Sequence, residues 1–426
     1  MNKRTKTTLR RWCLYGWTLA KWTMAASAIG VVCGLIGTMF HFGVHEVTAF
    51  RGTHPWVLYL LPLAGFVIVS FYKLTETDGL GTDDIIDAVH AGKRLPILLL
   101  PAIFFGTVLT HLCGGSAGRE GAALQMGGTI GQCMGRTFRL DDRDLRVATL
   151  AGMAAFFSAL FGTPLAATVF AIMVISIGVL YHVALYPSLL AALVAYGVSV
   201  RLGVEPTRFT VAVPDQSVGM FVRVAALGVL CALVSILFCK LMHGAGHLMK
   251  RIKNPWLRVI CGGFAVIALT WVFGTDYNGA GMDIVTRAIE QETVAVPWAF
   301  LLKLVFTAVT LAAGFKGGEV VPSFFVGATF GCAVSPLLGL PVGFGAAIGL
   351  AAVFCGVTNC PVASTLLAVE LFGAEGMLYF ALACCLSYML SGYQGLYSSQ
   401  TILYSKLKAQ FINVHTNAYH AGEKTE

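Results

Sequence analysis

The sequence predicts an all-α protein that crosses a lipid bilayer many times. Of its 426 residues, 57% are hydrophobic and only 12% are charged, whereas a soluble domain carries about 25% charged residues. The mean hydropathy is +0.77, and apolar segments follow one another with little relief from Thr23 to Ser391. The 48 glycines are scattered without a period, which favours the close helix packing and broken helices of transport proteins.

Each predicted membrane element is an apolar stretch with few charges, and one further helix, Ala122–Gly135, follows a glycine-rich turn. In chain order the apolar stretches include Thr23–Phe40, Trp56–Tyr72, Leu95–Leu112, Pro164–Val198, Gly219–Met242, Val259–Phe273, Pro297–Gly314 and Phe380–Ser391.

Short basic clusters predict the orientation in the membrane. They lie at residues 3–11 before the first span, at residues 250–258 in mid-chain and at residues 406–408 after the last span. Because cytoplasmic loops carry an excess of Lys and Arg, we place all three clusters and both termini in the cytoplasm of a multi-pass protein of the plasma membrane or cell inner membrane. The clusters are too small to indicate binding to nucleic acid.

The chain repeats itself weakly, which predicts two homologous halves. Three segments recur in the same order about 200 positions later: Asp78–Gly81 at Asn278–Gly281, Gly114–Gly127 at Gly314–Gly327, and Phe161–Ala166 at Thr358–Ala363. The predicted halves are residues 23–203 and 218–407. A basic cytoplasmic segment, residues 1–22, includes the start of the first helix, and a short cytoplasmic tail covers residues 408–426. The pairings alone leave open whether the halves are parallel or inverted.

The glycine-rich turn at Gly114–Ala122 carries two charges, Arg119 and Glu120, between apolar segments. A charge at membrane depth is costly, so it usually faces a polar cavity or an ion path. Backbone amides at the start of the following helix suit an anion, and Glu120 can carry a proton. The alternative is a tight interhelical turn in which Arg119 and Glu120 pair only with each other.

Signatures of other function classes are missing from the sequence. There is no ATP-binding loop, nucleophile elbow or zinc-protease motif. The twelve cysteines form no Cys-x-x-Cys pair, so we predict no disulfide framework, no metal site and no cofactor. Interrupted helices at matching places in two halves indicate a transporter for a small anion, not an enzyme. An intramembrane enzyme stays a remote alternative, because no clustered nucleophile and base is found.

At four places the chain resembles the CLC family of chloride channels and anion/proton antiporters. The motifs are Gly118-Arg119-Glu120-Gly121, Gly318-Glu319-Val320-Val321-Pro322, Gly79-Leu80-Gly81 and Gly395-Leu396-Tyr397-Ser398. Their order and spacing agree over nearly the whole chain. The resemblance implies a CLC-like homodimer in the lipid bilayer, with one ion path per subunit. It also implies two inverted-repeat halves of many tilted and broken helices.

The resemblance also implies roles for single residues. Glu120 would be the external gating glutamate, which alternately blocks the anion path and takes up a proton. Tyr397 would offer its hydroxyl to the central anion. Taken together, the expected anion-binding positions are Gly118, Arg119, Gly121, Leu80, Gly318, Val320 and Tyr397, and the expected proton-transfer residues are Glu120 and Glu319.

Three departures from the chloride antiporters resemble the fluoride/proton branch of the family. Leu80 replaces a serine that coordinates the anion, the segment Ala171–Val174 lacks an internal proton glutamate, and Glu319 stands in the second motif. The sequence therefore predicts secondary active export of fluoride in exchange for protons. A chloride/proton antiporter and a passive chloride channel are the alternatives. Glu319 could instead serve only as a helix-start carboxylate that is stabilised by the helix dipole.

Three other acidic residues are predicted to be structural. Thr82, Asp83 and Asp84 resemble a helix start with acidic first-turn residues, and the two carboxylates are expected to face solvent because they would repel an anion. Glu370 corresponds to Met173 in the other half, and we expect it to make a structural hydrogen bond and not to relay protons.

Overall fold

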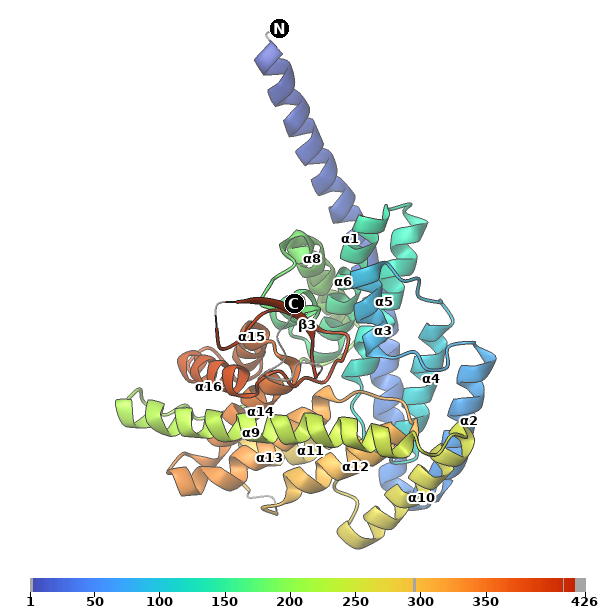
Figure 1. Cartoon of the computed structure of the whole chain (residues 1–426), viewed down its shortest axis with the longest axis vertical. Coiled ribbons are helices and arrows are strands. Elements are labelled where there is room, and N and C mark those ends of the chain that lie inside the picture. Colours follow the sequence, from blue (N-terminus) through green and yellow to red (C-terminus); the bar gives the residue numbers. More distant parts are fainter. Residues whose placement is uncertain (1–2, 294–295, 409, 418–426) are drawn as a thin grey trace.

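The computed structural model describes residues 3–293, 296–408 and 410–417. Within these residues sixteen α-helices make up two sets of eight (Figure 1). The first set consists of α1 (Lys3–Thr53), α2 (Leu61–Leu74), α3 (Thr82–Ala91), α4 (Leu99–Leu112), α5 (Glu120–Thr137), α6 (Asp142–Phe161), α7 (Pro164–Met173) and α8 (Leu185–Arg201).

The second set repeats the first, element by element. It consists of α9 (Val218–Met249), α10 (Pro255–Phe273), α11 (Met282–Glu290), α12 (Ala299–Ala313), α13 (Val320–Leu338), α14 (Val342–Thr358), α15 (Pro361–Phe372) and α16 (Met377–Leu390). Short 3-10 helices, η1 (Pro55–Leu60) and η2 (His182–Ala184), precede α2 and α8.

Several equivalent helices of the two halves begin at a constant spacing. Helices α3, α5 and α6 begin at Thr82, Glu120 and Asp142, and their counterparts α11, α13 and α14 each begin 200 positions later. The packing repeats as well, because α1 contacts α6 and α8 just as α9 contacts α14 and α16. The repeat seen in the sequence is therefore a repeat of the fold.

Glycines allow the closest helix crossings at equivalent places in the two halves. A Cβ atom at Gly127 of α5 would overlap the carbonyl of Gly152 in α6, and one at Gly327 of α13 would overlap that of Gly349 in α14. Small residues at such crossings let helix backbones approach within the bilayer. The helices α6 and α14 are buried over most of their length, which explains why they are apolar on all faces.

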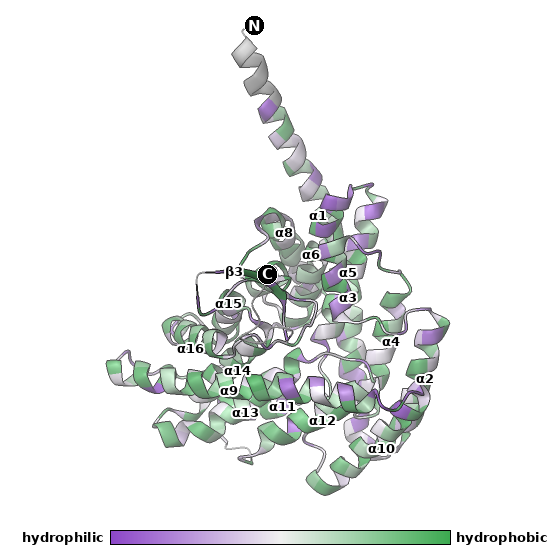
Figure 2. Cartoon of the chain, in the orientation of Figure 1, coloured by the Kyte–Doolittle hydropathy of each residue, from purple (hydrophilic) through white to green (hydrophobic). Residues whose placement is uncertain are grey.

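Seven of the described helices are long and apolar enough to cross a membrane. Apolar side chains are exposed on the outside of the molecule, for example Leu233 of α9 and Phe264 and Trp271 of α10. Figure 2 shows hydrophobic residues along much of α9. In a bilayer these side chains would face lipid tails, so the protein is a membrane protein with a lipid-facing apolar surface.

Two details differ from the sequence expectations. The helix after the glycine-rich turn begins at Glu120, not at Ala122, because a carboxylate is favourable in the first turn of a helix. The apolar stretch 164–198 is divided, since α7 ends at Met173 and α8 begins only at Leu185.

A small three-stranded sheet, which was not predicted, joins the chain's end to the first half. Strand β2 (Thr401–Tyr404) pairs in parallel with β1 (Ser176–Ile177) and antiparallel with β3 (Phe411–His415). Its strands have at most five residues, too few for a clear alternating pattern. The sheet supports the segment between α16 and β2, which contains Tyr397.

Candidate functional site

The glycine-rich turns of the two halves are hydrogen-bonded to each other. The amide of Gly118 donates to the carbonyl of Gly318 at 2.8 Å, and the amide of Gly318 donates back to the carbonyl of Gly118 at 2.7 Å. The two glycines are equivalent in the repeat, so the pair, here called the glycine bridge, has local two-fold symmetry.

A second reciprocal pair surrounds the glycine bridge. The amide of Ser116 donates to Thr310 Oγ1 at 3.1 Å, and the amide of the equivalent Lys316 donates to Thr110 Oγ1 at 3.2 Å. The two donors are equivalent in the repeat, and so are the two acceptors, and both contacts run from one half to the other. The reciprocal contacts therefore relate the two halves by a local two-fold axis at the bridge, as expected for two inverted repeats that face each other.

Two separate cavities lie on either side of the bridge. The Glu120 cavity has a volume of about 500 Å³, and the Glu319 cavity has about 330 Å³. The Glu120 cavity is lined by residues of the second-half loop before α11, and the Glu319 cavity by the equivalent first-half loop, residues 79–84. None of the described residues lines both cavities. The symmetry thus produces two cavities, one against the loop of each half.

Glu120 lies at the base of its cavity, at the start of α5. Its side chain is only 1% exposed. One carboxylate oxygen accepts a hydrogen bond from the amide of Arg119 at 2.9 Å, and the other lies 3.5 Å from Arg119 Nε. Both interpretations of this turn hold in part, because Glu120 pairs with Arg119 and also lines a cavity.

The Glu120 cavity is lined by three arginines and by two further carboxylates, those of Asp276 and Asp283. Arg119 reaches His41 Nδ1 at 3.1 Å, and Arg51 donates to the carbonyl of His111 at 2.6 Å. Arg287 also lines the cavity. The sequence reasoning missed Arg51 and the histidines, although basic residues inside or next to apolar stretches are a usable signal for a polar cavity.

Glu319 lies immediately before α13, and its carboxylate forms none of the ion pairs found in the described part of the chain. It lines the same cavity as Leu80 and Tyr397. The hydroxyl of Tyr397 is buried and has no hydrogen-bond partner among the described residues. A buried hydroxyl without a partner costs free energy, so this one is available to a ligand or to water.

Hydrogen bonds from residues distant in sequence fix the two segments that line the Glu319 cavity. The carbonyl of Tyr397 accepts from Thr416 Oγ1 at 2.6 Å, so the chain's final strand region fixes the tyrosine. The amide of Ser399 donates to Asp83 Oδ1 at 3.0 Å, which joins this segment to the loop at 79–84.

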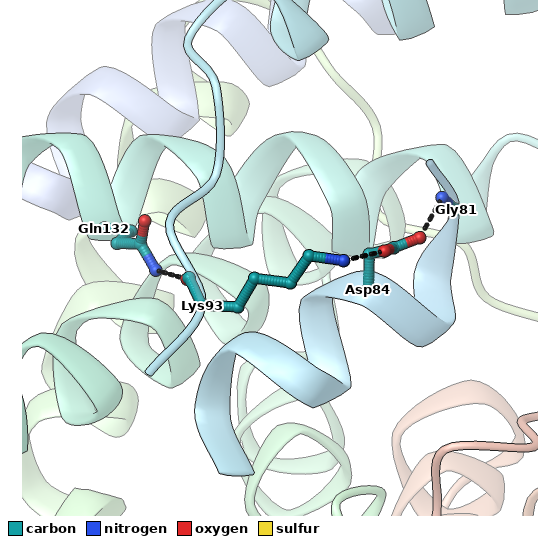
Figure 3. Close-up of polar contacts among 4 residues, drawn as sticks. All are labelled: Gly81, Asp84, Lys93 and Gln132. Carbon is teal, nitrogen blue, oxygen red and sulfur yellow. Dashed lines mark hydrogen bonds and ion pairs between the residues drawn. The ribbon is translucent and has the colours of Figure 1, made fainter. Parts of the chain in front are cut away.

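Asp84 fixes the loop that carries Leu80 through contacts with Gly81 and Lys93, which Figure 3 shows. Its carboxylate accepts from the amide of Gly81 at 2.9 Å and pairs with Lys93. The carbonyl of Lys93 in turn accepts from Gln132 Nε2 at 2.9 Å. The expectation that Asp83 and Asp84 face solvent was wrong. Both side chains line the cavity. A backbone amide and an ammonium group bind these carboxylates and offset the charge that would otherwise repel an anion.

The remaining expected residues fall into two groups. The amides of Gly118 and Gly318, expected to bind the anion, are used by the glycine bridge, so these glycines join the halves instead. Gly121 lies against Gly318, and Val320 opens α13, where the first amides have no acceptor within the helix. These two positions keep amides that can point to an anion.

Glu370 has the structural role that was expected. It lies in α15, and its two carboxylate oxygens accept hydrogen bonds from the amides of Leu165 at 3.1 Å and Ala166 at 2.8 Å. It therefore satisfies the first turn of α7 from the other half.

Comparisons with known proteins agree with this architecture. A protein of Pseudomonas syringae pv. tomato named chloride/fluoride channel protein is 39% identical over 400 residues, which cover 91% of this chain and 88% of that protein. An H(+)/Cl(-) exchange transporter ClcA of Vibrio campbellii is 25% identical over 382 residues and 81% of each chain.

Solved structures of related proteins also resemble this chain. The crystal structure of a CLC-type fluoride/proton antiporter has a TM-score of 0.88 and 32% sequence identity, and it covers 91% of this chain and 99% of that one. A slow cyanobacterial Cl-/H+ antiporter shares the fold at 19% identity, with a TM-score of 0.76 and coverage of 87% and 94%. The family described as voltage gated chloride channel matches residues 63–392, and with these observations the chain belongs to the CLC family of membrane transport proteins, which are not enzymes.

Proposed function

We propose that the protein is a secondary active transporter that exports fluoride in exchange for protons. The observation that carries the proposal is the pair of buried or half-buried glutamates, Glu120 and Glu319, each in its own cavity on either side of one glycine bridge. Two proton-carrying groups that face opposite cavities suit coupled exchange better than an open pore.

Glu120 would gate the anion path and exchange protons with the external side. Its cavity is lined by the second part of α1, residues 41–52, and the chain's basic N-terminal segment lies at the other end of that helix. With that segment in the cytoplasm, the Glu120 cavity opens outward and the Glu319 cavity opens inward.

Glu319 would carry protons on the inner side. The region around Met173 offers no carboxylate, so Glu319 is the glutamate nearest to the inner path. The anion would pass between Tyr397, Leu80 and the amides of Gly121 and Val320, with Arg119 as the positive charge beside the outer gate.

Fluoride is favoured over chloride by two considerations. Leu80 lines the inner cavity without a hydroxyl, and the relative with a solved structure at 32% identity is a fluoride/proton antiporter. A chloride/proton antiporter or a passive channel is the second candidate, supported by the relative named chloride/fluoride channel protein. We also propose a homodimer in the plasma membrane or cell inner membrane, with both termini in the cytoplasm.

The test is anion efflux from proteoliposomes loaded with equal concentrations of fluoride and chloride, with the external pH recorded. Coupled export predicts fluoride release with proton uptake and little chloride release. Equal release of both anions would indicate a general anion transporter. Fluoride release without proton movement would indicate a channel.

A further inference from the structure

We propose that Lys316 and Tyr72 form an additional anion-binding site in the Glu319 cavity, an access site that holds fluoride before it reaches Tyr397. This inference rests on the proposed function for the identity of the anion, but the site itself is defined by the geometry of two side chains that line this cavity.

Lys316 brings a positive charge into a cavity that the carboxylates of Asp83, Asp84 and Glu319 also line, but it is paired directly with none of them in the described residues. In the described chain Lys316 Nζ forms no ion pair and no hydrogen bond. The charge lies 4.1 Å from the centre of the Tyr72 ring, a cation–π contact. A ring face replaces only part of the hydration that an ammonium loses, so an anion is the natural partner.

Tyr72 supplies a hydrogen-bond donor at the same place. Its side chain is 1% exposed, and its hydroxyl is buried with no partner in the part of the chain that the structure describes. Because the ammonium group lies against the ring that carries this hydroxyl, both groups can donate hydrogen bonds to one anion between them. A compact ammonium group together with one hydroxyl suits a small, hard anion better than an oxyanion, which would favour the planar fork of arginine.

The neighbouring helix makes room for this pair. A Cβ atom at Gly106 of α4 would lie 3.1 Å from Lys316 Cγ and 3.2 Å from Tyr72 Cε2. The glycine therefore lets the lysine side chain run between α4 and the tyrosine ring. The repeat does not copy the arrangement, since the equivalent positions are Ser116 and Val272. The site belongs only to the Glu319 cavity, as expected for a path that takes up its anion from one side.

The test compares Lys316→Met and Tyr72→Phe with the wild-type protein. Lys73→Met is the matched control, because Lys73 Nζ also lies over an aromatic ring, 3.7 Å from the centre of Trp256, but does not line the cavity. One readout is the NaF concentration that gives half of the maximal rise in melting temperature, at constant ionic strength. The other is the fluoride concentration that gives half-maximal efflux from liposomes.

We expect Lys316→Met to raise both concentrations about tenfold or more, as for loss of a hydrogen bond to a charged group. Tyr72→Phe should raise them about two- to tenfold, as for a neutral hydrogen bond, and Lys73→Met should leave them within about twofold. Gly106→Ala should act in the same direction as Tyr72→Phe, because it displaces the pair without removing a charge. If Lys316→Met does not fold, Tyr72→Phe and Gly106→Ala decide the question.

Values within about twofold of wild type for both Lys316→Met and Tyr72→Phe would overturn the site. A wild-type protein that responds to NaCl but not to NaF would refute the fluoride function alone, and the same variants would then be judged with NaCl. A wild-type protein that responds to neither salt would overturn the site as well.

Discussion

Replacing Gly318 by alanine should break the glycine bridge and destabilise the whole protein. A Cβ atom at Gly318 would overlap the amide of Gly121 and lie 2.8 Å from its Cα, and these are backbone atoms of the opposite half that cannot rotate away. The two halves would have to separate at their point of closest approach.

The cost follows from the contacts that are lost. The two hydrogen bonds between Gly118 and Gly318 contribute about 0.5–1.5 kcal/mol each, and overpacking of a tight contact costs about 1–3 kcal/mol more. The total is about 2–6 kcal/mol, a large fraction of the stability of a typical protein. Separation of the halves should also open a passage between the cavities, so fluoride should leak without proton movement.

The assay is thermal unfolding of purified protein in detergent, with fluoride and proton flux measured in parallel. Gly244→Ala is the matched control, because Gly244 lies in α9 and a Cβ atom there would meet nothing within 4 Å. Alanine at that position should be neutral or slightly stabilising. A Gly318→Ala protein with the melting temperature and coupling of wild type would refute the symmetric bridge as the element that joins the halves.

Three further substitutions test the roles of single residues by proton and anion flux. Glu120→Gln should abolish proton movement while anion movement slows or becomes passive, and uphill fluoride transport driven by a pH gradient in this variant would contradict the gating role; Glu370→Gln is the control. Glu319→Gln should leave the purified protein folded but cripple exchange, whereas a merely structural role predicts a loss of about 0.3–1 kcal/mol in stability and nearly normal flux. Leu80→Ser restores a donor that contributes about 0.5–1.5 kcal/mol, so chloride transport should rise about tenfold at most, and an unchanged fluoride-to-chloride ratio would remove Leu80 from the path.

Much of the fold could be predicted from the sequence because glycines recur at equivalent positions of the two halves. Positions such as Gly118 and Gly318 must remain glycine where backbones touch, so the spacing of 200 residues stays visible. The sequence also placed Glu370 correctly, since a carboxylate in an apolar helix needs donors.

Other features of the site could not be read from residue types alone. Asp83 and Asp84 were assigned to solvent because their charge would repel an anion, but Ser399, which is distant in sequence, and Lys93 provide the compensating contacts. Tyr72 was read only as the end of an apolar stretch. Its hydroxyl becomes significant only when the structure shows it buried without a partner among the described residues.

The function of this protein depends on where the two halves differ, because their symmetry alone would create two identical cavities. Arg119 and Glu120 of the first half correspond to Glu319 and Val320 of the second. Each cavity therefore receives one glutamate, but from a different position of the repeat. Glu120 has its cation next to it in sequence, whereas Glu319 forms no ion pair with any residue that the structure describes and shares its cavity with Lys316.

This difference gives the two glutamates different chemical environments. Arg119 pairs with the Glu120 carboxylate, and in the proposed gating role that carboxylate would have to gain a proton or move away before an anion could take its place. At the other end, an anion that neutralises Lys316 would stand beside Glu319 and favour the protonated form of that glutamate. In the proposed transporter, uptake of an anion on the inner side would thus promote uptake of a proton at the same place, and Lys316→Met should weaken this coupling even at fluoride concentrations that saturate transport. Unchanged proton-to-fluoride stoichiometry in that variant at saturation would show that Lys316 acts on anion affinity alone.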